Sequence, residues 1–300
     1  MRPIAEAYKD FPILHKEHNG HRVIYLDSGA TAQIPQSVID RVVEHMTQRN
    51  GNPHRGSHIL AIEASEDYEN ARDRVVEFIN AREREEVIFT RNSTESMNLI
   101  AHSYGLHNVK KGDKIVITVA EHHANLVTWQ YVAEQTGATL EYMYLDEHGH
   151  LKDGEINKID EKTKIVAFAH VSNVLGMEFP VKELTEKAHS VGAIVVLDGA
   201  QSTPHKKIDV QALDCDFFVF SGHKMCASQG IGVLYGKRDL LETMPPFLLG
   251  GDMIEYVKEQ TATFNELPYK FEAGTPNADG AVSLHAAIDY LESFGMDAKI

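Results

Sequence analysis

The chain of 300 residues, 43% of them hydrophobic, is long enough to fold around a sizeable core of its own. Its 29 basic and 44 acidic residues give a net charge of −15 and form no basic stripe, which argues against nucleic acid as a partner. No apolar run approaches the length that spans a bilayer, so we expect no membrane insertion.

Short β-rich runs alternate with amphipathic helical stretches along most of the chain, which is typical of a mostly parallel sheet covered by helices. Residues 1–20 are expected to form an arm with a short helix, residues 21–278 one continuous α/β domain, and residues 279–300 a helix leading out of it. Predicted strands are 87–90, 114–119, 139–145, 164–170, 193–198, 216–221 and 232–236. Predicted helices before the last one are 65–81, 93–105 and 180–192.

An acid and a lysine occur at consecutive strand ends, where open α/β sheets bind their ligands. Asp198 ends the run AIVVLD, and Lys224 follows the next strand within SGHK. Pyridoxal phosphate (PLP) needs an amine for its aldehyde and an anion for its ring nitrogen. A solvated loop aspartate and a surface lysine are the alternative interpretation. The pairing favours PLP, with Lys224 as its Schiff-base lysine and Asp198 keeping the ring nitrogen protonated.

The turn after strand 87–90 offers donors for a phosphate. Ser93 and Thr94 begin a helix, whose first N–H groups are unpaired and favour an anion. A capping box between Asn92 and Glu95 is a second interpretation, and the two are compatible because capping leaves some donors free.

Polar side chains follow two further strands. His123, after 114–119, is placed to stack on the pyridine ring, although an ordinary polar loop residue is the alternative. Asn173, after 164–170, can donate to the phenolic oxygen of the ring, and Gln201 is a second candidate for that atom. The 17 histidines lack companion ligands at metal-site spacing, so we assign no metal.

Eight segments together resemble the SufS-type cysteine desulfurases, a branch of the class V aminotransferase group of fold-type I PLP enzymes. The segments are LDSGAT (26–31), HRGSH (54–58), FTRNSTESMNL (89–99), EHHANLVTW (121–129), HVSNVLG (170–176), VLDGAQS (196–202), SGHKMC (221–226) and FEAGTPN (271–277). The resemblance covers nearly the whole chain. It implies the large domain of that fold, a mostly parallel seven-stranded sheet between helices.

The same resemblance implies roles for individual residues. Lys224, Asp198, His123, Asn173 and Gln201 take the positions around the ring described above. Thr94 is joined at the phosphate by Ser221 and His223. The resemblance also implies a homodimer, in which Thr275 reaches the phosphate of the partner subunit.

Members of this group are longer, and their C-terminal part holds the cysteine that receives sulfur and the arginine that grips the substrate carboxylate. We therefore expect the C-terminal small domain to be largely absent from this sequence. Cys226, two residues beyond Lys224, is either a packed thiol or a substitute sulfur carrier. Cys226 and Cys215 are the two cysteines, which suits a reducing compartment, and we expect the cytoplasm.

The resemblance implies conversion of L-cysteine to L-alanine, with the sulfur passed as a persulfide to an acceptor protein of iron–sulfur cluster assembly. Two alternatives stay open. One is a selenocysteine lyase or related PLP β-lyase, which releases its product without a protein persulfide. The other is a catalytically silent PLP-binding homologue or fragment.

Overall fold

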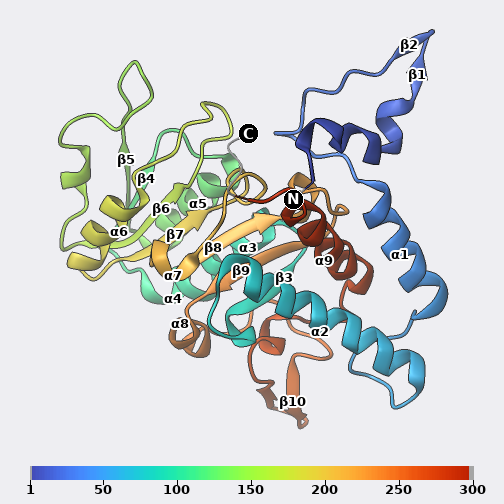
Figure 1. Cartoon of the computed structure of the whole chain (residues 1–300). Coiled ribbons are helices and arrows are strands. Elements are labelled where there is room, and N and C mark those ends of the chain that lie inside the picture. The colour runs from blue at the N-terminus through green and yellow to red at the C-terminus, as the bar shows by residue number, and fades with distance from the viewer. Residues whose placement is uncertain (1, 297–300) are drawn as a thin grey trace.

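A seven-stranded sheet runs through the centre of the computed structural model, which describes residues 2–296 (Figure 1). Its strands lie in the order β3-β9-β8-β7-β6-β4-β5, and β9 alone runs antiparallel to its neighbours. All seven predicted strands are confirmed, each with its ends shifted by two residues or fewer. They are β3 (Val87–Thr90), β4 (Lys114–Thr118), β5 (Thr139–Met143), β6 (Thr163–Ala169), β7 (Ile194–Asp198), β8 (Phe217–Ser221) and β9 (Gly232–Gly236).

Helices cover both faces of this sheet, as Figure 1 shows. Alternate residues of a strand face opposite layers, so Val195 and Leu197 of β7 pack in one buried cluster and Ile194 and Val196 in the other. The first cluster contains side chains of α2 (Ile59–Ile79), α6 (Val181–Ser190) and α9 (Ala278–Glu292). The second contains side chains of α3 (Ser93–Ile100), α5 (Val127–Thr136) and α8 (Arg238–Thr243).

Helix ends differ from the prediction where side chains act as caps. Helix α2 begins six residues earlier than predicted, because the His58 ring accepts a hydrogen bond from Ala61 N–H. The predicted helix 93–105 is α3 followed by a π-helical turn, Ala101–Gly105. Helix α9 ends at Glu292 and packs on α2 and α1 (Gln36–Gln48), while residues 297–300 of the predicted last helix lie outside the described residues.

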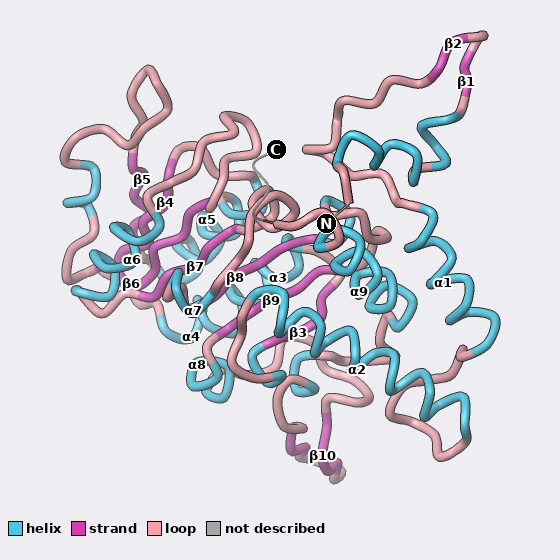
Figure 2. Tube along the Cα trace, viewed as in Figure 1, coloured by secondary structure: helices cyan, strands magenta, loops and turns pink. Residues whose placement is uncertain are grey.

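Smaller elements lie around this body. The expected arm contains two 3₁₀ helices, Ile4–Asp10 and Pro12–His15. Two hairpins, absent from the prediction, extend outward in Figure 2: β1 (Glu17–His18) with β2 (His21–Arg22), and β10 (Ile254–Val257) with β11 (Ala262–Phe264). The remaining short helices are α4 (Leu106–Asn108) and α7 (Val210–Leu213). No helix within residues 2–296 is long and apolar enough to cross a membrane.

Candidate active site

A pocket of about 580 Å³ lies where β6, β7 and β8 end, at the carboxyl edge of the parallel strands. This is the edge at which open α/β sheets bind ligands. Two of the predicted site residues, His123 and Thr275, do not line the pocket. The other eight do: Lys224, Asp198, Ser93, Thr94, Asn173, Gln201, Ser221 and His223.

Asp198 presents a buried carboxyl group to this pocket. It is the last residue of β7, its exposed fraction is 6%, and its Oδ1 accepts a hydrogen bond of 2.9 Å from Ala200 N–H. Its Oδ2 has no hydrogen-bond donor among residues 2–296. Burial raises the pKa of the carboxyl, opposed by the Ala200 hydrogen bond and by the charges of Lys224 and His122. A buried acid with one free oxygen requires a donor, and the described residues supply none.

Lys224 ends the 3₁₀ turn Gly222–Lys224 that directly follows β8. The side chain is half-buried, and burial lowers the pKa of its amine, opposed by the charge of Asp198. A lowered pKa makes the neutral amine, which is the nucleophilic and basic form, more available. Lys224 and Asp198 both line this pocket, as their strand-end positions predict.

The turn at the start of α3 and the end of β8 form a polar cradle. Ser93 N–H donates to Ser221 Oγ at 2.8 Å, and the two hydroxyl oxygens are also 2.8 Å apart. Half of the expected capping box forms: Asn92 Oδ1 accepts from Glu95 N–H, but the Glu95 carboxylate accepts from Arg91 N–H, one residue before the cap. Capping leaves Thr94 N–H without a protein acceptor in the described part of the chain. Hydroxyls and a free first-turn N–H suit an anion.

The structure corrects the choice between two adjacent histidines. His122, not His123, lines the pocket. The reason is local: His122 has extended backbone angles and caps a 3₁₀ turn through Nδ1, whereas His123 is the first residue of that turn. Burial lowers the pKa of His122, and the charge of Asp198 opposes this. Since a neutral imidazole is favoured, the ring can form a flat wall for a heterocycle.

An N-terminal segment, residues 27–32, closes one side of the site. His223 O accepts hydrogen bonds from Ala32 N–H at 2.8 Å and Thr31 Oγ1 at 3.1 Å. The Gln201 amide donates to Gly29 O at 2.8 Å, which occupies part of its donor capacity. Asn173 is exposed at the pocket wall and makes no side-chain hydrogen bond within residues 2–296, so its amide is the freer of the two candidates.

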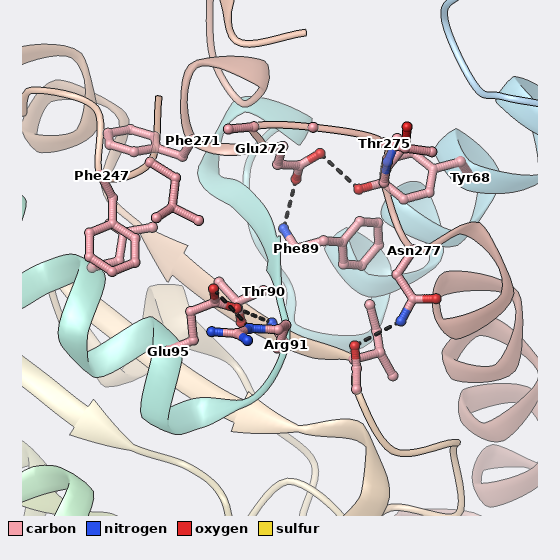
Figure 3. Close-up of a pocket in the computed structure, with 17 residues that line it drawn as sticks. Tyr68, Phe89, Thr90, Arg91, Glu95, Phe247, Phe271, Glu272, Thr275 and Asn277 are labelled. Atoms are coloured by element: carbon pink, nitrogen blue, oxygen red, sulfur yellow. Dashed lines mark hydrogen bonds and ion pairs between the residues drawn. The ribbon is translucent and has the colours of Figure 1, made fainter. Parts of the chain in front are cut away.

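Thr275 lies in a second pocket, also about 580 Å³, with Arg91 and Asn277 (Figure 3). It is exposed and separate from the cavity that contains Lys224. The expectation that it completes a partner subunit's site therefore concerns an assembly of two chains.

Two groups near the pocket change the picture drawn from the sequence. Burial raises the pKa of Cys226 to about 12, and Cys226 does not line the pocket, so its thiol is packed rather than reactive.

Glu121, which the sequence did not single out, is 8% exposed and accepts hydrogen bonds from Thr118 and Asn125. Burial raises its pKa to about 8, opposed by those two bonds. Its only sequence signal was a carboxyl group after β4.

The groups that line this pocket fit PLP. The buried Asp198 oxygen suits a protonated ring nitrogen, the Lys224 amine suits an aldehyde, and the cradle around Ser93 and Ser221 suits a phosphate. A parallel sheet with this acid and this lysine at adjoining strand ends defines the large domain of a fold-type I PLP enzyme.

Comparison with known proteins agrees with that class. Residues 24–299 match the Aminotransferase class-V family. A protein of Halalkalibacterium halodurans named probable cysteine desulfurase is 54% identical over 293 residues, which are 97% of this chain and 72% of that protein. This chain belongs to the cysteine desulfurases of the class V aminotransferase family.

Solved structures give the same result. The apo cysteine desulfurase of Thermococcus onnurineus NA1 is 41% identical with a TM-score of 0.93, covering 99% of this chain and 72% of that one. The cysteine desulfurase CsdA of Escherichia coli is 39% identical with a TM-score of 0.89, covering 99% and 73%. The selenocysteine lyase, β-lyase and silent-homologue alternatives are not favoured by these relatives.

Proposed function

We propose that this chain binds PLP in the pocket between Asp198 and Lys224 and releases sulfur from L-cysteine, leaving L-alanine. The observation that carries the proposal is that Lys224 lines the same pocket as buried Asp198, whose Oδ2 has no hydrogen-bond donor among residues 2–296. When bound, the cofactor supplies an aldehyde for the substrate amine and a protonated ring that accepts an electron pair from the α-carbon.

The residues around the ring have distinct tasks in this proposal. Asp198 holds the proton on the ring nitrogen through its free oxygen. Lys224 binds the aldehyde, and its Nζ later takes the α-proton of the substrate. His122, in place of His123, forms the wall along one face of the ring, and Asn173 or Gln201 donates to the phenolic oxygen.

The phosphate is held in this proposal by donors from two elements. Ser93 and Thr94 contribute from the start of α3, and Ser221 and His223 contribute from the end of β8. Thr275 of a second copy completes the set in a homodimer. Residues 21–278 then form the cofactor-binding domain, with residues 1–20 as an arm and residues 279–300 leading out of it.

In this proposal, the thiol that accepts sulfur from the substrate is neither Cys215 nor Cys226. Both are free, and burial raises the pKa of each thiol. Overall, L-cysteine and an acceptor thiol give L-alanine and a persulfide, which balances without another oxidant. We propose a sulfur-acceptor protein of iron–sulfur cluster assembly as the final recipient. Two free cysteines suit the reducing cytoplasm, which is the compartment we propose.

The test is to incubate the purified chain with PLP, L-cysteine and a small thiol and to measure alanine and released sulfide. Lys224→Ala is expected to abolish alanine formation and the visible absorption band of the lysine-bound cofactor. Lys207→Ala, an exposed lysine outside the pocket, is the matched control. A Lys224→Ala variant that kept both properties would refute the site. A wild-type chain that bound the cofactor but formed no alanine would refute the activity alone.

A further inference from the structure

A buried ion pair covers the free edge of the central sheet. Strand β3 is one of the two terminal strands and pairs only with β9, so Val87 and Phe89 direct backbone groups away from the sheet. Arg72 Nη1 donates to Val87 O at 2.8 Å, and Glu272 Oε1 accepts from Phe89 N–H at 2.7 Å. In a parallel ladder, one residue of a neighbouring strand would satisfy the same carbonyl and the same N–H.

The side chains of Arg72 and Glu272 form hydrogen bonds with each other as well as with β3. Arg72 Nη1 and Nη2 donate to Glu272 Oε1 and Oε2 at 2.7 and 2.9 Å. The exposed fraction of the Arg72 side chain is 0% and that of Glu272 is 6%. Tyr68 Oη donates to the same carboxylate at 2.8 Å, as Figure 3 shows beside the Phe89 contact. Because the pair is bidentate, the orientation of the Arg72 guanidinium is fixed.

The Arg72–Glu272 pair is hydrogen-bonded to β3, the strand that leads into the phosphate turn of the site. Phe89 is followed by Thr90 and Arg91 and then by the turn Asn92–Thr94, whose three residues line the pocket. On the other side, Glu272 begins a stretch that ends at Asn277, whose Nδ2 donates to Gly230 O just before β9 (Figure 3). Both ends of that stretch are thus tied to the β3–β9 edge.

We infer that Arg72 and Glu272 are positioning residues: together they stand in for a missing neighbour strand along β3 and so fix the anion-binding turn Asn92–Thr94. Neither residue lines the cofactor pocket. The inference rests on the proposed function only for what the turn binds. A backbone displacement of this turn by about 1 Å is enough to lower binding or activity by up to about a hundredfold.

The deciding variant replaces both charges, Arg72→Met with Glu272→Met. An apolar pair of similar volume tolerates burial, whereas a single charge left unpaired is strongly destabilising. Arg72 Nε also contacts the Glu69 carboxylate at 3.1 Å, and that carboxylate keeps His54 as a partner at 3.1 Å. The double variant is therefore expected to fold, but Val87 O and Phe89 N–H lose their partners. Arg72→Met with Glu272→Gln also removes both charges but keeps an amide oxygen for Phe89 N–H, so this variant is expected to rescue part of the effect. Arg74→Met is the matched control, because Arg74 lies on the same helix and pairs with Asp289 and Glu292 of α9.

Two measurements test the inference. Hydrogen exchange of amides 88–94 is expected to rise about tenfold in the double variant, because the strand edge opens. The preference for PLP over unphosphorylated pyridoxal is expected to fall about tenfold, which a loss of global stability alone would not produce. Unchanged exchange and unchanged preference in the double variant, or equal changes in Arg74→Met, would overturn it. A wild type that binds both compounds equally refutes the proposed function, while the exchange measurement still decides this inference.

Discussion

Gly199 lies between the site acid and the core, and enlarging it by one methyl group gives a quantitative test of how Asp198 is held. A Cβ at this position would lie 2.0 Å from Phe218 Cζ and 2.5 Å from Cε1. Carbon atoms in contact prefer about 3.5 Å or more, so the ring or the backbone must move by roughly 1.5 Å. Phe218 is 0% exposed and surrounded by core, so its ring has no free space to enter.

We expect Gly199→Ala to lower the free energy of unfolding by about 1–3 kcal/mol, the usual cost of overpacking a core. Because Gly199 N–H donates to Val219 O at 2.8 Å, the backbone shift also moves the Asp198 carboxyl. PLP affinity should therefore fall by about ten- to a hundredfold. Urea unfolding is followed by the emission of Trp129, the single tryptophan, which is 0% exposed.

Two companion variants separate overlap from other causes. Gly250→Ala is the control, since its Cβ would meet no atom nearer than 3.8 Å. Phe218→Leu removes the overlapping ring atoms, so the cost of Gly199→Ala should be smaller in that background. An equal cost in both backgrounds, or no cost in the wild-type background, would refute the reasoning.

Three further outcomes follow from the site. Asp198→Asn should lower the turnover of L-cysteine about a hundredfold at saturating PLP, because an amide does not hold a proton on the ring nitrogen; unchanged turnover would remove Asp198 from that role. Glu121 has its pKa raised from 4.5 to about 8, so the folded state retains a proton that the unfolded state loses. The stabilisation from protonated Glu121 is complete below pH 4.5 and is lost by pH 8. In urea titrations the free energy of unfolding should therefore fall by up to about 5 kcal/mol across that range, and Glu121→Gln should flatten this fall. Burial raises the pKa of Cys226 to about 12, so iodoacetamide should alkylate it about a thousandfold more slowly in the folded than in the urea-unfolded protein at pH 8, as measured by mass spectrometry.

The central sheet was predictable because its strands carry a strong local signal. Runs such as IVVLD and FFVFS are apolar on both faces, as buried parallel strands require, and tertiary packing agrees with that pattern. Helix α1 escaped prediction although it is amphipathic, because the N-terminal region lacks the alternation with strands that organised the rest. The hairpin β10–β11 has mostly exposed residues and leaves almost no pattern of burial to detect.

The site was predictable in outline because strand order brings strand ends together. Asp198 and Lys224 meet at one pocket since β7 and β8 are adjacent and parallel. The choice between His122 and His123 could not be made from two identical neighbours; the 3₁₀ turn that begins at His123 decides it. Glu121 escaped notice because its burial depends on the packing around Thr118, Asn125 and the neighbouring strand, not on its own position in the chain.

The order of strands also determines when the site can form during synthesis. Strand β3 joins the sheet only through β9, so residues 87–90 must wait for residues 232–236 before they have a partner. A chain emerging from the ribosome has made both Asp198 and Lys224 before that pairing is possible, but its phosphate turn is still unanchored. In the proposed function, productive loading of the cofactor therefore follows the translation of residues 232–236.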